Sequence, residues 1–89
     1  MKAIVSVFSK DRIGIIADVC VMLKDMKVNV LDLSQTVMDD MFTMVTMLDT
    51  ATSDMTFDQI QESLAKGGEA LGLAIRIQRQ DIFDAMHKI

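Results

Sequence analysis

The stretch SKDRIGIIADVCVMLKDMKVNVLDLS (residues 9–34) decides the fold, because its hydrophobic periodicity changes from that of a helix to that of a strand. After the polar turn SKDR, the apolar residues recur at helical spacing: Ile16, Val19 or Cys20, Leu23 and Met26. This spacing predicts a helix over residues 14–26. The run VNVLDLSQTVM (28–38) is apolar and rich in β-branched residues, and it predicts a strand.

Further strands are expected on both sides of this stretch. KAIVSVF (2–8) is short and β-branched, which favours a strand. MFTMVTMLDT (41–50) is separated from the 28–38 strand by Asp39-Asp40, and this arrangement predicts a hairpin. LAIRIQ (73–78) alternates apolar and polar residues, as a strand with one solvated face does.

Two signals mark the start of a second helix. Thr56 and Gln59 have the spacing of a capping box, in which each side chain accepts a hydrogen bond from the backbone of the other residue. Met55 and Ile60 stand at the two positions of a hydrophobic staple.

The sequence leaves two positions open for the end of this helix. Gly72 favours a helix over residues 57–71, with an apolar face of Phe57, Ile60, Leu64 and Leu71. The Gly67-Gly68 pair is a weak helix former and would allow an earlier end. A short amphipathic helix is also expected at the C-terminal end, where one stripe contains Ile82, Phe83, Met86 and Ile89.

The expected order is strand, helix, strand, strand, helix, strand and a short terminal helix, in a single domain over residues 1–89. Two split βαβ units form a ferredoxin-like α+β sandwich, a βαββαβ fold with a four-stranded antiparallel sheet and two helices on one face. The first three strands carry apolar residues on both faces, as Ile4 and Val5 do. We therefore expect a homodimer or higher homo-oligomer that covers the second face.

Composition excludes several classes of partner. The net charge of −4 repels phosphate backbones, and only 4% of the residues are aromatic, so no nucleic-acid partner is expected. No apolar run approaches the roughly 20 residues that span a bilayer, so no membrane partner is expected. The lone Cys20 cannot form an internal disulfide and suits a reducing compartment, so we expect a cytoplasmic protein.

No motif indicates catalysis, a metal site or a cofactor, so we expect a protein that is not an enzyme. The chain contains no GxGxxG, P-loop or HExxH motif. His87 is the only histidine, and a solvated side chain is a simpler interpretation than a catalytic base. The methionines of the middle strands fit an adaptable core better than a soft-metal site: Met38, Met41, Met44 and Met47.

The loop Asp11-Arg12-Ile13-Gly14 has two interpretations. Asp11 can cap the following helix by accepting a hydrogen bond from the N–H group of Ile13 or Gly14. Gly14 can also let a ligand approach the backbone, where the N–H groups at the start of the helix attract an anion such as a carboxylate. The residue pattern alone leaves both interpretations open.

The segment DRIGIIADVCVMLKDMKVNVLDLS (11–34) resembles the signature of the ACT domain family, whose usual form is Asp-Arg-Pro-Gly, a helix and a Val-Asn-Ile strand. VNVLDLSQTVMDDMFTMVTMLD and RIQRQDIFDAMHKI are similar to free-standing single-ACT-domain proteins and to the ACT domains of the glycine cleavage system transcriptional repressor. Two residues depart from the usual form: Ile13 replaces the proline, and Lys27 stands where a glycine commonly ends the first helix.

The resemblance implies a small regulatory module that binds an amino acid or related metabolite at a homodimer interface and signals to a partner protein. The ligand-binding residues it implies are Asp11, Arg12, Ile13 and Gly14 of one subunit and Asn29 and Val30 of the other. The rival hypothesis is a ligand-free dimerisation or protein–protein interaction module, in which the loop only caps a helix.

Overall fold

Six elements follow one another in the computed structural model, which describes residues 1–80. They are β1 (Lys2–Lys10), α1 (Ile15–Asp25), β2 (Asn29–Met38), β3 (Met41–Asp49), α2 (Phe57–Leu71) and β4 (Ala74–Arg79). The boundaries of each lie within two residues of those expected from the sequence. The expected terminal helix over 82–89, with His87, lies outside the described residues.

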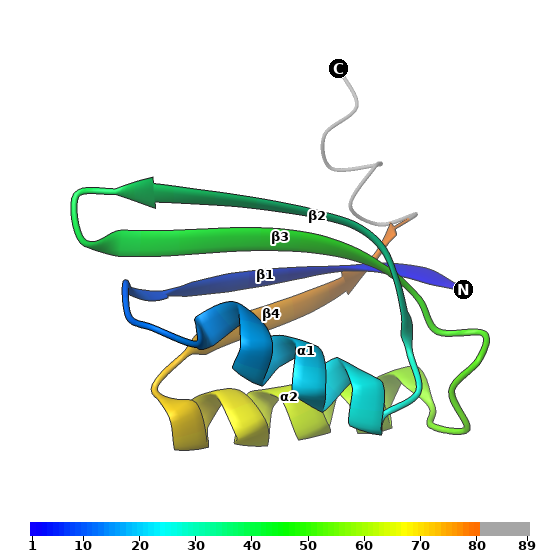
Figure 1. Ribbon diagram of the computed structural model, residues 1–89. Coiled ribbons are helices and arrows are strands. Elements are labelled where there is room, and N and C mark those ends of the chain that lie inside the picture. The colour runs from blue at the N-terminus through cyan, green and yellow to red at the C-terminus, as the bar shows by residue number, and fades with distance from the viewer. Residues whose placement is uncertain (81–89) are drawn as a thin grey trace.

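The four strands form one antiparallel sheet in the order β2-β3-β1-β4. Both α1 and α2 lie on the same face of this sheet, which confirms the ferredoxin-like α+β sandwich (Figure 1). The edge strands are β2 and β4. The loop between β1 and α1 lies at the same end of the sheet as the β2–β3 turn (Figure 1).

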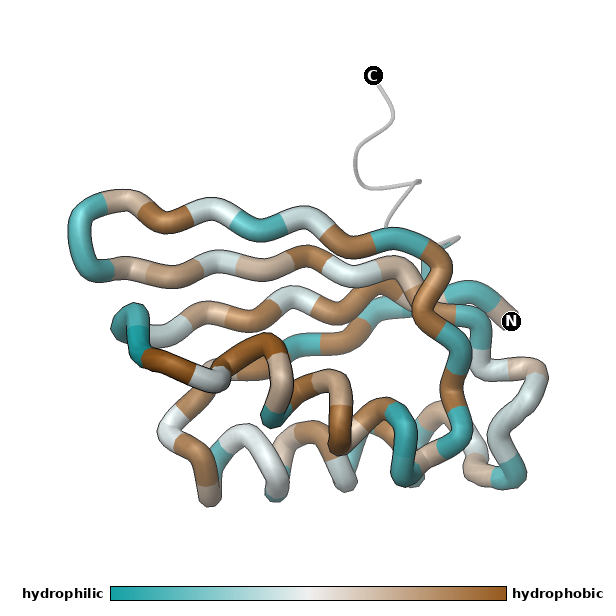
Figure 2. The backbone as a smooth tube through the Cα atoms, in the orientation of Figure 1, coloured by the Kyte–Doolittle hydropathy of each residue, from teal (hydrophilic) through white to brown (hydrophobic). Residues whose placement is uncertain are grey.

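The hydrophobic core lies between the two helices and the sheet face that they cover. Apolar and polar residues alternate along the central strands, so every second side chain enters this core (Figure 2). The largest apolar side chains that are fully buried are Ile15, Leu23, Met44, Leu48, Ile60, Leu64, Val5, Val7 and Val19. In α1 the buried face begins at Ile15, whereas the spacing in the sequence suggested Ile16.

Thr46 brings a hydroxyl group into the centre of this core. Its side chain is 0% exposed, and its Oγ1 atom has no hydrogen-bond partner within residues 1–80. A buried polar group without a partner costs about 1–3 kcal/mol of stability.

Replacing Thr46 with valine should therefore raise the free energy of unfolding by about 1 kcal/mol or more, because valine keeps the branched shape and removes the hydroxyl group. Urea denaturation followed by circular dichroism measures this change. Thr46→Ser is the control, because it keeps the hydroxyl group and removes a methyl group, and it should be less stable than the wild type. A Thr46→Val protein that is less stable than the wild type would contradict the prediction.

Helix α1 ends in a tight turn at Lys27, whose φ of 59° lies in the left-handed region. The Lys27 N–H group donates to the Lys24 carbonyl oxygen at 3.0 Å, and the Val28 N–H group donates to the Leu23 carbonyl oxygen at 3.2 Å. These two bonds form a Schellman motif. Glycine adopts the left-handed conformation of this position without strain, whereas a residue with a Cβ atom, such as Lys27, is strained there.

We expect Lys27→Gly to raise the free energy of unfolding by about 1 kcal/mol, because it relieves the strain of the left-handed backbone. Chemical denaturation measures the difference. Lys27→Ala removes the same exposed ion pair with Asp54 (3.7 Å) but keeps the Cβ atom, so it should give no such gain. If the glycine variant proved less stable than the alanine variant, strain at this turn would not be the controlling factor.

Helix α2 begins and ends at the residues that the sequence indicated. The Gln59 N–H group donates to Thr56 Oγ1 at 3.2 Å, and the Thr56 N–H group donates to Gln59 Oε1 at 2.9 Å, which confirms the capping box. Gly72 closes the helix with a φ of 74°. The alternative of an earlier end at Gly67-Gly68 is wrong, because the helix continues to Leu71.

The Gly67-Gly68 pair serves close packing instead. A Cβ atom at Gly67 would collide with the sulfur of Met22 on α1, and one at Gly68 would lie 2.9 Å from Cδ1 of Ile75 on β4. The two glycines therefore let α2 approach α1 and the sheet more closely than larger residues would allow.

Candidate functional site

The loop between β1 and α1 is held to the β2–β3 turn by a backbone hydrogen bond. The Asp11 N–H group donates to the Asp40 carbonyl oxygen at 2.7 Å. Asp39, which precedes this acceptor, has a φ of 54°, a conformation that aspartate tolerates better than most residues. Two segments that are far apart in the sequence are thereby fixed together at one end of the sheet (Figure 1).

The start of α1 differs from the expectation that Asp11 caps the helix. Gly14 is the N-cap residue, with a φ of 90°, and no side chain caps the helix. The prediction of an Asp11 cap is wrong because a capping side chain belongs at the N-cap position, and Asp11 lies three residues earlier. The Asp11 backbone is instead bonded to the β2–β3 turn.

The uncapped start of α1 opens into a cavity of about 200 Å³. The first hydrogen bond within the helix runs from the Asp18 N–H group to the Gly14 carbonyl oxygen at 2.9 Å, so the N–H groups of Ile15, Ile16 and Ala17 have no partner inside the helix. These groups carry the positive end of the helix dipole. The cavity is lined by Asp11, Arg12, Gly14, Ile15, Ile16, Ala17, Gln35, Val37 and Phe42.

Arg12 acts chiefly as a structural tie at the rim of this cavity. Its guanidinium group donates to Asp18 Oδ2 at 3.2 Å and to the carbonyl oxygens of Ile13 at 3.2 Å and Leu71 at 3.4 Å. Arg12 thus connects the loop to the first turn of α1 and to the last residue of α2. Ile13 is 99% exposed and is absent from the cavity wall.

Within one chain, the structure does not bring Asn29 and Val30 to the loop. Asn29 pairs with Asp49 at the far end of the β2–β3 hairpin, whereas Val37 pairs with Phe42 at the cavity end. Both Asn29 and Val30 are exposed on the edge strand. A site that combines them with the loop needs a second chain.

The sequence interpretation missed the three residues that form the sheet side of the cavity, namely Gln35, Val37 and Phe42. A signal for them was present. Gln35 and Val37 follow Leu33 at the two-residue period of a strand, and the Asp39-Asp40 turn fixes Val37 opposite Phe42. The hairpin register therefore predicts which side chains reach the loop.

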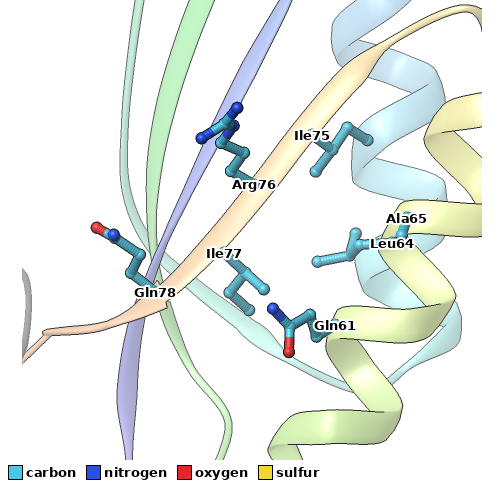
Figure 3. Close-up of a pocket in the computed structure, with 7 residues that line it drawn as sticks. All are labelled: Gln61, Leu64, Ala65, Ile75, Arg76, Ile77 and Gln78. Carbon is cyan, nitrogen blue, oxygen red and sulfur yellow. The ribbon is translucent and has the colours of Figure 1, made fainter.

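A larger hollow, of about 360 Å³, lies between α2 and β4, and no uncapped helix start lies in its wall (Figure 3). Ile75 and Ile77 point toward Leu64 of α2, whereas Arg76 and Gln78 point away from the helix (Figure 3).

Residues 1–80 contain no group of three or more histidine, cysteine, aspartate or glutamate side chains arranged to hold a metal ion. In the same range, no helix has the length and apolarity needed to cross a membrane.

Comparison with known proteins identifies the family. The sequence profile of the ACT domain matches residues 2–78. A UPF0237 protein of Clostridium acetobutylicum is 44% identical over 89 residues, which are the full length of both chains. An ACT domain protein from Streptococcus pneumoniae, known from its solved structure, is 34% identical, with a TM-score of 0.84 over 94% of each chain.

A more distant solved structure extends the likeness of fold. It is that of a putative glycine cleavage system transcriptional repressor, which is 15% identical with a TM-score of 0.74 over 86% of this chain and 44% of that chain. ACT domains are generally regulatory modules that bind amino acids. From its signature, its fold and its relatives, this chain belongs to the ACT domain family.

Proposed function

We propose that this protein is a regulatory module that binds an amino acid or a closely related metabolite in the cavity at the start of α1. The observation that carries the proposal is the uncapped N-terminus of α1, which faces a cavity of about 200 Å³ lined in part by Asp11. That volume lies below the range of roughly 300–1,000 Å³ for drug-sized ligands, so a small metabolite fits it best.

The two ends of an amino acid match the two sides of this cavity. The N–H groups of Ile15, Ile16 and Ala17 favour the ligand carboxylate, because unpaired donors and the helix dipole both attract an anion. Asp11 also lines the cavity, and its carboxylate would supply the negative charge for the ligand ammonium group. Neither role requires a reacting group, so binding is proposed without catalysis.

A second copy completes the site through the edge of β2. Two β2 strands that pair antiparallel about a two-fold axis bring the start of one strand beside the end of the other. Asn29 and Val30 of the second copy would then lie near Val37 and the first loop. The ten residues of β2 include no proline and only one charged residue, Asp32, so little protects this edge from pairing.

A ligand-free interaction module is the second candidate function. It is favoured by apolar side chains that remain exposed at the loop end of the molecule, where Ile13 is 99% and Met38 is 68% exposed. In either case the assembled module would pass its state to a regulated partner protein.

A thermal-shift panel of the twenty amino acids tests the proposal. At least one amino acid should raise the melting temperature in a saturable manner, and the rise should grow with ligand concentration as linkage requires. If neither an amino acid nor a close metabolite shifts the melting temperature, the ligand-free interaction module becomes the better interpretation.

A further inference from the structure

The face of the sheet away from α1 and α2, which we call the open face, has an apolar centre. Ile4 and Phe8 of β1 lie there beside Val45 and Met47 of β3, the other central strand. Phe8 is 42% exposed and Val45 is 40% exposed. This confirms the sequence expectation that the strands are apolar on both faces, and a cluster of this kind is typical of a contact surface.

Two opposite charges flank the apolar centre, one on each edge strand. The strand register places Asp32 of β2 beside Met47, and Arg76 of β4 beside Ser6. Figure 3 shows the Arg76 side chain directed away from α2, to the side of β4 opposite Ile75. Within residues 1–80, the Arg76 guanidinium group forms neither a hydrogen bond nor an ion pair.

The open face is hollowed on both sides of its centre. One hollow of about 420 Å³ lies along β1 and β4 and includes Phe8 and Arg76 in its wall. The other, of about 120 Å³, lies over β2 and β3 and includes Asp32 and Val45. The face therefore has room for side chains of a partner beside each charged residue.

We propose that the open face binds the open face of a second copy of this chain, about a two-fold axis parallel to the strands. That axis reverses the strand order, so β4 of one copy covers β2 of the other. Arg76 then faces the region of Asp32 and Ser34 on the second copy, and the reverse contact forms as well. The central strands, with Phe8 and Val45, pack against each other.

The charges of Arg76 and Asp32 favour this arrangement over packing about a two-fold axis that runs across the strands. An axis across the strands would place β4 over β4 and β2 over β2, which brings Arg76 toward Arg76 and Asp32 toward Asp32. Like charges in a contact of low dielectric constant are unfavourable. The register places Arg76 level with Ser34, two residues along the strand from Asp32, so the long arginine side chain has to reach across one side-chain row to meet the Asp32 carboxylate.

The open-face contact is separate from the β2-edge contact invoked for ligand binding. The cavity at Gly14 lies on the helix side of the sheet, so it stays accessible when the open faces meet. In the strand-parallel arrangement the β2 edges of the two copies lie on opposite sides of the sandwich, so a chain that uses both contacts assembles into an open-ended array and not into a closed tetramer.

Charge reversal with restoration tests the proposal. In sedimentation velocity at physiological salt, Arg76→Asp and Asp32→Arg should each raise the dissociation constant of the open-face contact at least about tenfold. The double variant Asp32→Arg/Arg76→Asp should restore association to roughly the wild-type level, because it exchanges the two charges. Val45→Lys, at the centre of the face, should abolish the contact whatever the flanking charges.

Lys66→Glu is the matched control, because it changes the net charge as Arg76→Asp does but lies on the exposed side of α2. It should leave association unchanged. The proposal would be overturned if neither of the single charge reversals nor Val45→Lys weakened association. The open face would then have another occupant, such as residues 81–89 of the same chain. Failure of the double variant to restore association would overturn the strand-parallel arrangement.

The same variants separate this proposal from ligand binding. Any amino-acid-induced rise in melting temperature should persist in Arg76→Asp, since the cavity and the β2 edge are intact. If no amino acid raises the melting temperature, but the single charge reversals weaken association and the double variant restores it, the proposed function is contradicted and the open-face contact is supported.

Discussion

Replacing Phe42 with alanine should lower the free energy of unfolding by about 3–5 kcal/mol, the range for large-to-small aromatic substitutions in a core. Phe42 is 3% exposed and belongs to the core cluster between the sheet and the helices. It also forms part of the cavity wall beside Val37. Domains of this size are only marginally stable, so the variant should be largely unfolded at moderate urea concentrations.

Phe8→Ala provides the matched comparison, because Phe8 is the same residue type on the neighbouring strand but is 42% exposed on the open face. At protein concentrations below the open-face dissociation constant, its cost should stay below about 2 kcal/mol. The cost should grow with protein concentration if that face is buried by a second copy. Equal costs for Phe8 and Phe42 at every concentration would contradict the assignment of the two faces.

A bound amino acid should produce the second large effect. At about 100 times its dissociation constant, a ligand that binds only the folded state adds about 2.7 kcal/mol per site. For a domain of this length, that corresponds to a rise of roughly 10–20 °C in melting temperature. Differential scanning fluorimetry over a ligand series measures the rise and its saturation.

Filling the cavity should abolish this rise without disturbing the fold. Ala17→Leu places a larger side chain in the cavity wall on the first turn of α1, at an exposed helical position that accepts leucine well. Val21→Leu is the control one turn later, where the side chain is 55% exposed and outside the cavity wall. An undiminished response in Ala17→Leu would place the ligand elsewhere.

Gly14→Val is a less informative change, although Gly14 also lines the cavity. A Cβ atom at Gly14 would meet no other atom within 4 Å, so the space next to the glycine is open. The φ of 90° is the obstacle, because a β-branched residue is strained in that conformation. The variant would therefore lose stability with or without a ligand.

The two helices show how far sequence reasoning reaches in this chain. Thr56, Gln59 and Gly72 determine α2 through contacts within a few residues, so both ends follow from local chemistry. The first residue of α1 was predicted to within one position, but the absence of a side-chain cap was not, because the Asp11 backbone is bonded to Asp40 of the β2–β3 turn. A local pattern indicates which side chains can cap a helix, but contacts with distant segments decide whether they do.

The candidate site divides in the same way. The loop part was predicted from Asp11 and Gly14 in the sequence. The sheet part, Gln35 and Val37, follows only once the hairpin register is fixed. A third part, formed by Asn29 and Val30 of a second copy, depends on how two chains pair. No pattern within one chain fixes that geometry, so it stays a prediction.

Amide NMR can show whether an amino acid binds at the start of α1. The isotopically labelled protein is titrated with the amino acid that gives the largest thermal shift. We expect saturable chemical-shift changes that are largest at the amides of Ile15, Ile16 and Ala17, where the ligand carboxylate accepts hydrogen bonds. Smaller changes should occur at Asn29 and Val30 through the second copy. Saturable changes confined to the open face, or none at the start of α1, would contradict ligand binding in this cavity.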